Sequence, residues 1–418
     1  MDFPKMTIVG QKFDEIRLED IPREVFSELS KLNLVTRVKP GAHVGITAGS
    51  RGIANMATIL KSIIDFLKEL GALPFVFPAM GSHGGATAEG QKQVLAGYGI
   101  TEASMEAPIL SGMEVEEIWR TEKGIPVFLD HYALSADFLV IVNRIKPHTK
   151  FKAPLESGLF KMMAIGMGNH QGAQLYHKAA LQYGIYPIIL EAGKFILAKC
   201  PVLFGLGMVE NAYEETALIE AIPPEEMFDK EQKLLLEAKR WMARLPFDDI
   251  DVLIVDEIGK DISGTGMDTN ITGRNRDLIG DFEHHVRIKR IFVRDLSEKS
   301  DGNATGIGFA DFTTKRLVDK IDLKTTYMNC LTGISPEKGA IPIYFSNDRE
   351  ALEACLNTIG MVNPEKSRIL HIRNTLQLHR VEVSEAFRED LLDRSDLTLL
   401  GEWEPMRFDS HGNILSAL

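Results

Sequence analysis

Two apolar runs on either side of a helical pattern, between residues 43 and 85, constrain the fold of this chain most. HVGITAG at 43–49 and PFVFPAMG at 74–81 each predict a short buried strand. Between them, apolar residues recur at helical spacing and stop before Gly71, which marks a helix end. They are Met56, Ile59, Leu60, Ile63, Ile64 and Leu67. A strand–helix–strand unit of this kind joins parallel strands by a right-handed crossover, so the sequence predicts an α/β fold.

A third apolar run, ADFLVIVNRI at 136–145, predicts another strand of the same sheet. In open parallel sheets, ligands bind at the loops that follow the carboxyl ends of the strands. The three loops here carry GSRG with Arg51, GSHGG with His83 and KPHTK with His148. One such residue in one loop is more often a bystander, but three at equivalent positions predict a shared site.

The charged helical segment from Pro223 to Leu245 predicts a join between two domains. After it, strand-like and helix-like runs alternate again. We therefore expect an N-terminal catalytic and cofactor-binding domain at 1–245 and a C-terminal domain at 246–399, with the active site in the cleft between them. Each domain is expected to be Rossmann-like, with a mainly parallel sheet flanked by helices. The tail at 400–418 is expected to pack back on the first domain.

Two polar segments leave alternatives open. RIKPHTKFK at 144–152 gathers cations in an acidic chain, which indicates either a small anion site or a solvated loop. GKDISGTGMDTNITGRNRD at 259–277 is rich in glycine and hydroxyl groups. Such a loop either presents backbone N–H groups to an anion or is a flexible connection.

The composition argues against several classes of protein. A net charge of −12 argues against general nucleic-acid binding, and no apolar run reaches the ~18 uncharged residues of a membrane helix. The three cysteines are too scattered for a disulfide framework, and the start lacks a secretion signal. We expect a cytoplasmic protein that acts on a small molecule. The sequence does not indicate an oligomeric state.

The segment SGLFKMMAIGMGNHQGAQLYH at 157–177 allows a first interpretation. Gly166-x-Gly168-x-x-x-Gly172 approximates a dinucleotide-binding turn, and Glu191 lies about where a ribose-binding acid would. The spacing is one residue too long, and a lysine falls inside the required strand. These two departures weaken the motif, so an NAD-dependent dehydrogenase is the alternative function and not the preferred one.

Four motifs together resemble those of the nickel-pincer-nucleotide-dependent lactate racemases, and a weaker similarity extends over most of the chain. GSRG at 49–52 is similar to the family's Thr-Arg-Pro turn, and MGSHGGATAE at 80–89 to its Gly-x-His segment. KPHTK at 146–150 matches the segment with the second histidine. SGLFKMMAIG at 157–166 is similar to the family's Ser-Gly-Gly-x-Lys segment.

The resemblance implies a role for each matched residue. Arg51 would bind the substrate carboxylate, with Ser50 beside it in contact with the cofactor. His83 and His148 would be the acid/base pair, and Lys161 would attach covalently to the nickel-pincer nucleotide, a pyridinium thioamide/thiocarboxylate mononucleotide.

A nickel-binding histidine follows the lysine in this family. It lies sixteen residues after the lysine, a spacing that selects His177 as the metal ligand. His170 can be matched only by deleting seven residues, so His177 is preferred and His170 stays open.

The activity that the resemblance implies is that of an isomerase. It would racemise or epimerise a 2-hydroxy acid by moving a hydride to and from the cofactor, through a 2-keto acid. Imidazole titrates near neutral pH, so two histidines suit proton exchange with the hydroxyl of either enantiomer. Arginine suits a carboxylate through paired N–H donors, and nickel accepts imidazole together with the cofactor's sulfur and carbon donors. Cofactor-synthesis enzymes would be needed for maturation.

The chain departs from the family at substrate-facing positions. Ala48 stands where the racemase has an acidic residue, and Gly273 where it has a glutamine. Arg276 matches a substrate-contacting lysine, although Arg274 could take that role instead. We therefore expect a hydroxy acid other than lactate, larger or more anionic. A second alternative is a paralogue that binds the nucleotide without catalysis, against which the two retained histidines weigh.

Overall fold

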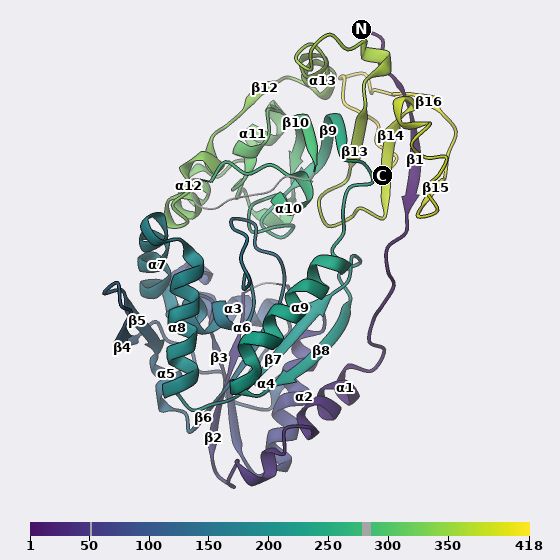
Figure 1. Cartoon of the computed structure of the whole chain (residues 1–418). Coiled ribbons are helices and arrows are strands. Elements are labelled where there is room, and N and C mark those ends of the chain that lie inside the picture. The colour runs from purple at the N-terminus through teal and green to yellow at the C-terminus, as the bar shows by residue number, and fades with distance from the viewer. Residues whose placement is uncertain (51, 278–285) are drawn as a thin grey trace. The chain divides into compact units, whose positions relative to one another are not determined.

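The computed structural model describes residues 1–50, 52–277 and 286–418, and the chain forms two compact units (Figure 1). The C-terminal unit comprises Met1–Asp14 and Ala243–Leu418, and the N-terminal unit comprises Glu15–Met242. Each unit combines a sheet with flanking helices, which confirms the predicted α/β class. Over the described residues, no helix combines the length and apolar character that crossing a bilayer requires.

The C-terminal unit is built on a nine-stranded sheet in the order β12-β11-β10-β9-β13-β14-β1-β15, with β16 also paired to β1. Neighbouring strands from β12 to β13 are parallel, and those from β13 to β15 are antiparallel. The strands are β1 (Lys5–Gln11), β9 (Asp249–Ile258), β10 (Arg287–Leu296), β11 (Phe312–Thr314), β12 (Ile343–Phe345), β13 (Ile369–Ile372), β14 (Arg380–Ser384), β15 (Leu397–Leu399) and β16 (Glu404–Pro405). The helices are α10 (Thr269–Thr272), α11 (Lys315–Asp319), α12 (Leu323–Thr332) and α13 (Asp348–Leu356).

The first strand of the chain corrects the predicted domain division. β1 pairs with β14 through Thr7 and Val383, and with β16 through Met6 and Glu404. Residues 1–14 therefore belong to the C-terminal unit, and the tail at 400–418 pairs within that unit and not with the sheet of the first domain. The residues of KMTIVGQ at 5–11 carry no information about the strand with which they pair. The junction between Met242 and Ala243 lies close to the predicted one after 245.

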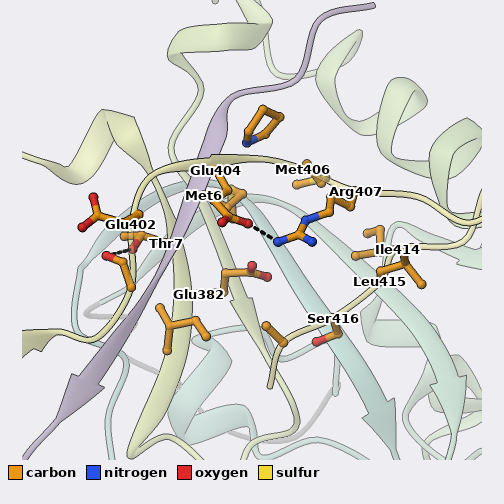
Figure 2. Close-up of a pocket in the computed structure, with 14 residues that line it drawn as sticks. Met6, Thr7, Glu382, Glu402, Glu404, Met406, Arg407, Ile414, Leu415 and Ser416 are labelled. Carbon is orange, nitrogen blue, oxygen red and sulfur yellow. Dashed lines mark hydrogen bonds and ion pairs between the residues drawn. The ribbon is translucent and has the colours of Figure 1, made fainter.

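A pocket of about 400 Å³ lies where β1, β14 and the tail meet (Figure 2). Its acidic lining includes Glu382, Glu402 and Glu404, and Glu404 forms an ion pair with Arg407 of the same segment. Behind Glu382 lies the fully buried His371, whose Nδ1 is 2.9 Å from the Glu382 carboxylate. None of the residues predicted to form the functional site lines this pocket.

The N-terminal unit is built on a five-stranded sheet in the order β3-β2-β6-β7-β8, in which only the last pair is antiparallel. The strands are β2 (His43–Ala48), β3 (Leu73–Pro78), β6 (Phe138–Arg144), β7 (Val202–Glu210) and β8 (Thr216–Ile222), with a separate hairpin of β4 (Val115–Arg120) and β5 (Pro126–Asp130). The helices are α1 (Ile21–Ser30), α2 (Met56–Glu69), α3 (Ala88–Gly97), α4 (Glu102–Met105), α5 (His131–Ser135), α6 (Leu159–Lys161), α7 (Asn169–Tyr183), α8 (Ile185–Lys199) and α9 (Met227–Trp241).

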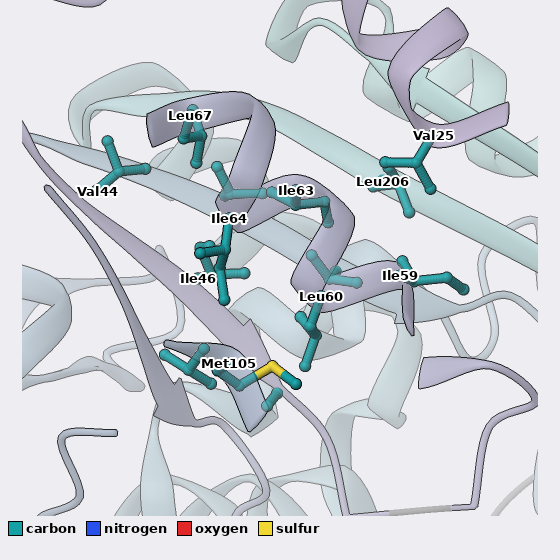
Figure 3. Packing of buried hydrophobic residues seen from close by; sticks show 14 of the residues in the cluster. Val25, Val44, Ile46, Ile59, Leu60, Ile63, Ile64, Leu67, Met105 and Leu206 are labelled. Carbon is teal, nitrogen blue, oxygen red and sulfur yellow. The ribbon is translucent and has the colours of Figure 1, made fainter. Parts of the chain in front are cut away.

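The predicted strand–helix–strand unit forms the core of the N-terminal unit. The five aliphatic residues predicted to share one face of α2 after Met56 are all fully buried: Ile59, Leu60, Ile63, Ile64 and Leu67. They pack with Val44 and Ile46 of β2 and with Leu206 of β7 (Figure 3). Full burial of each such side chain stabilises the fold by about 1.5–3 kcal/mol. This packing fixes β2 and β3 side by side in parallel, with Ala48 opposite Pro78, so both strands end at the same edge of the sheet.

Candidate functional site

Two glycines allow the carboxyl ends of β2 and β3 to approach the segment that carries Lys161. A Cβ placed on Gly49 would lie 3.3 Å from Met162 Cε and 3.8 Å from Asn143 Oδ1. One placed on Gly166 would lie only 2.6 Å from the carbonyl oxygen of Ala79. Only glycine permits the backbone to approach as closely as Gly166 approaches Ala79. The end of each of these strands therefore lies beside the segment that carries Lys161.

Ser50 and His83 are in direct contact, so the loops after β2 and β3 meet as predicted. The hydroxyl of Ser50 is hydrogen-bonded to Nδ1 of His83. The backbone carbonyl of Ser50 accepts a hydrogen bond from the Tyr98 hydroxyl at 3.1 Å. A bond at Nδ1 fixes the orientation of the imidazole ring and couples its tautomer to the hydroxyl. Arg51, the predicted carboxylate ligand, lies outside the described residues.

His148 is held in a loop that closes on itself beside β6. Lys146 and Ser157 exchange backbone hydrogen bonds at 2.9 and 3.2 Å at the foot of this loop. Nδ1 of His148 accepts the backbone N–H of Lys150 at 3.0 Å, and its ring centroid lies 4.4 Å from that of Phe151. Because Nδ1 accepts a hydrogen bond, the neutral ring carries its proton on Nε2. In this state His148 presents a proton donor.

Glu156 supports the His148 loop and was not predicted from the sequence. Its fully buried carboxylate accepts the backbone N–H of His148 at 2.6 Å and forms ion pairs with Lys239 at 2.6 Å and Lys152 at 3.7 Å. Arg144, at the start of the basic stretch, is paired with Glu210. Part of the positive charge at 144–152 is therefore neutralised within the protein, which weakens the interpretation of this stretch as an anion site.

Lys161 ends the short helix α6 and is followed by a π-helical turn at Met162–Gly166. The two residues before it, Leu159 and Phe160, are fully buried, and Lys161 itself is half-buried. A π-helical turn is rare and occurs frequently at functional sites. The dinucleotide-binding turn requires a strand before Gly166, and the structure has a helix there. The alternative interpretation through Gly166, Gly168 and Gly172 is therefore wrong, and NAD is not supported.

The two candidate nickel ligands lie on α7, which follows the π-helical turn and begins at Asn169. Asn169 has a positive φ of 48° and donates to Asp130 at 2.6 Å. His170 is in the first turn, and its buried Nδ1 has no hydrogen-bond partner among the described residues. His177 is half-buried and follows Tyr176, whose buried hydroxyl accepts the backbone N–H of Phe128 at 3.0 Å. Within the described part of the chain, no three His, Cys, Asp or Glu side chains form a cluster that could hold a metal ion.

In the C-terminal unit, both arginines proposed to contact substrate are bound to Asp311. Arg274 also donates to the carbonyl oxygen of Ile288 at 2.8 Å, and 17% of its side chain is exposed. Arg276 lies 3.3 Å from Asp311 and keeps 44% of its side chain exposed. Arg274 therefore acts mainly in holding its own sheet, and Arg276 is the one of the two with more surface available to a ligand.

The backbone conformation at position 273 accounts for the presence of glycine there, without reference to the substrate. It ends α10 with a φ of 62°, and a Cβ there would lie 2.8 Å from the carbonyl oxygen of Val286. A glutamine at this position would clash, so the glycine does not indicate an enlarged pocket. The polar loop at 259–277 is also internally bonded: Asp261 accepts hydroxyl hydrogen bonds from Ser297 at 2.5 Å and Ser300 at 3.1 Å. The structure thus favours neither alternative proposed for this loop.

Comparison with known proteins finds similarity to solved structures but not to family models or curated sequences. No protein-family model matches the sequence, and no curated protein matches it significantly. The chain is similar to the lactate racemase apoprotein from Thermoanaerobacterium thermosaccharolyticum, with 13% sequence identity and a TM-score of 0.46. The match covers 82% of this chain and 100% of that chain. Similarity at this level is too low to assign a family or an activity.

Proposed function

We propose that this chain is a racemase or epimerase of a 2-hydroxy acid that works with a nickel-pincer nucleotide held through Lys161 and His177. The observation that supports it best is the meeting of the Ser50–His83 pair with the segment of Lys161 at one edge of a parallel sheet. An acid/base imidazole and a nucleophilic amine are two of the groups that such an enzyme needs, and this edge is where α/β sheets bind ligands.

The donor set fits a cofactor that brings most of its own metal ligands. A metal ion bound by protein side chains alone needs several of them, and the described residues offer no such cluster. A nucleotide that supplies sulfur and carbon donors needs only one imidazole from the protein. Both candidates, His170 and His177, lie on α7, the helix that follows the Lys161 segment. Nδ1 of His170 is buried and has no hydrogen-bond partner among the described residues.

The chain's own residues would bind the substrate and move its hydroxyl proton. When bound, the nickel-pincer nucleotide supplies a carbon that takes up and returns the hydride of the substrate α-carbon. Arg51 would hold the carboxylate through paired N–H donors. His83, oriented by Ser50, would take the hydroxyl proton through Nε2, and His148 would supply a proton from the loop after β6. Reversal of these roles would serve the other enantiomer.

Nickel content and peptide mass test this proposal together. Protein produced alongside the cofactor-synthesis enzymes should contain one nickel per chain and a mass adduct on the peptide that carries Lys161. Lys178, on α7, serves as a control and should stay unmodified. Finding no nickel and an unmodified Lys161 in such material would contradict the proposed cofactor and with it the reaction.

A further experiment separates catalysis from storage of the nucleotide. Loaded protein is incubated with a mixture of 2-hydroxy acids, one of them deuterated at the α-carbon. A racemase should invert the stereocentre of at least one of them. A protein that only binds the nucleotide would contain nickel and leave every substrate unchanged, which would favour the paralogue alternative.

A further inference from the structure

The start of the Lys161 segment is capped by a carboxylate that comes from a distant helix. Glu231 of α9 is fully buried, and its Oε2 accepts the backbone N–H of Phe160 at 3.0 Å. The N–H of Leu159 also acts on this carboxylate and lowers its pKa. These are the first two residues of α6, and Lys161 is the third. The Glu231 carboxylate therefore binds the backbone of the residue directly before Lys161, the proposed cofactor attachment point.

Residue 158 is shaped for this contact. A Cβ placed on Gly158 would lie 2.2 Å from Oε1 of Glu231, so any larger residue would push the carboxylate away. On its other side, the carbonyl oxygen of Gly158 accepts the side-chain amide of Asn143 at 2.8 Å. The backbone before Lys161 is thus held between the end of β6 and the inner face of α9.

The first N–H groups of a helix have no partner within it and are usually capped by the side chain just before them. Here that position is Gly158, which has no side chain, and α6 has no side-chain cap of its own. Leu159 and Phe160 are fully buried at the same time, so their N–H groups cannot turn to water. Without Glu231, this turn would have buried donors and no acceptor for them.

We propose that Glu231 is a positioning residue for Lys161: it fixes the turn from which the amine reaches the cofactor. The role of Lys161 as a cofactor attachment point rests on the proposed function, but the contact between Glu231 and the backbone does not. Glu231 touches neither substrate nor cofactor in this proposal and acts only through the backbone of Leu159 and Phe160. Burial raises the pKa of Glu231 to about 8, although the backbone N–H groups of Phe160 and Leu159 oppose this rise.

The test is the Glu231→Gln variant of the full chain, studied without cofactor. Glutamine keeps the length of the side chain but leaves a single acceptor oxygen, and its NH₂ group cannot accept a backbone N–H. Hydrogen exchange of the peptide covering 158–163 should accelerate at least tenfold. Acylation of Lys161 by an amine reagent, followed by peptide mass, should change at least threefold, while acylation of Lys178 stays as in the wild type.

Glu156→Gln is the matched control, because Glu156 is equally buried and also accepts a backbone N–H, but from the His148 loop. It should accelerate exchange around His148 and leave the acylation of Lys161 unchanged. A purely structural role for Glu231 would lower the unfolding midpoint without this local pattern. Unchanged exchange and acylation at 158–163 in folded Glu231→Gln protein would overturn the proposal.

Gly158→Ala decides the matter if Glu231→Gln does not fold, since its Cβ displaces the same carboxylate. It should reproduce the faster exchange and altered acylation, and wild-type values would overturn the proposal. Loading with cofactor then separates the two hypotheses. Wild-type protein without an adduct would contradict the proposed function and leave the positioning result intact. An adduct in the wild type that falls at least tenfold in Glu231→Gln would support both.

Discussion

Ser50 and Lys150 show how a single hydrogen bond determines what a neighbouring imidazole can do. At His83, Nδ1 faces a hydroxyl group that can donate or accept. At His148, Nδ1 faces a backbone N–H that can only donate. The hydrogen bond thus fixes the neutral tautomer of His148, whereas the partner of His83 permits either one.

Replacing either histidine by alanine should abolish turnover and leave nickel binding in place. Loss of a general acid or base typically slows a reaction by about 10²–10⁴-fold. The measurement is the rate of inversion of a 2-hydroxy acid by loaded His83→Ala and His148→Ala protein, with nickel determined in the same samples. His43→Ala is the control, since His43 is exposed at the opposite, amino end of β2. Full activity in either of the first two variants would remove that residue from the mechanism.

Gly166→Ala should destabilise the N-terminal unit by about 1–3 kcal/mol, since the added methyl group is forced against the Ala79 carbonyl and the Met162 sulfur, both 2.6 Å away. Urea unfolding of the two proteins measures the difference. Gly97→Ala is the matched control, because nothing lies within 4 Å of a Cβ at this helical position. That variant should be as stable as the wild type or up to about 1 kcal/mol more stable. An equal effect of both substitutions would show that the close approach at Gly166 is unimportant.

At the scale of elements, α7 separates the two nickel candidates by about two helical turns. His170 and His177 are seven residues apart on one helix, which separates them by about 10 Å along its axis. The proposed cofactor needs one imidazole from the protein, so we expect the nickel ion to use only one of them.

The choice between them can be measured directly. We expect His177→Ala to lose nickel at least tenfold and His170→Ala to retain it, with the Lys161 adduct present in both. Nickel and peptide mass are determined after the same loading procedure. The reverse pattern would assign the metal to His170, whose Nδ1 would then gain the partner that the described residues do not provide.

The same scale shows what the sequence can and cannot predict. β2, α2 and β3 were predicted because burial on one face imposes a period that any single sequence reveals. α9 was interpreted only as a charged join, although Glu231 interrupts its buried face of Met227, Leu234, Leu235 and Ala238. A carboxylate within such a stripe is a signal that could have been found. Its partners at 159 and 160 could not, because hydrogen bonds between distant segments leave no period in the sequence.

At the scale of the whole molecule, the C-terminal unit contains a buried charge network beside the pocket of Figure 2. His371 lies 2.6 Å from Asp256 and 2.9 Å from Glu382. Burial alone lowers the pKa of His371, but the two carboxylates outweigh it and raise the pKa to about 9. Ser416 of the tail donates to Asp256 at 3.2 Å, so this network also holds the end of the chain.

The stability of the C-terminal unit should therefore fall as pH rises from about 6.5 to about 9. A pKa raised in the folded state means that the contribution of His371 is complete below its ordinary value of 6.5 and is lost as pH passes about 9. The full loss corresponds to about 3 kcal/mol. Urea unfolding followed by Trp403, with Trp119 and Trp241 replaced by phenylalanine, reports this unit alone. A free energy of unfolding that stays constant between pH 6.5 and 9 would contradict the assignment.

The pairing of β1 has a consequence for the order in which the protein is made. Val9 is opposite Val381, so roughly 370 residues must be synthesised before this strand can meet its neighbour. At about 5–20 residues per second, that wait lasts on the order of 20 s or more. The N-terminal unit is complete by residue 242 and can fold on the ribosome during that time. The segment that is translated first is therefore among the last to reach its native place.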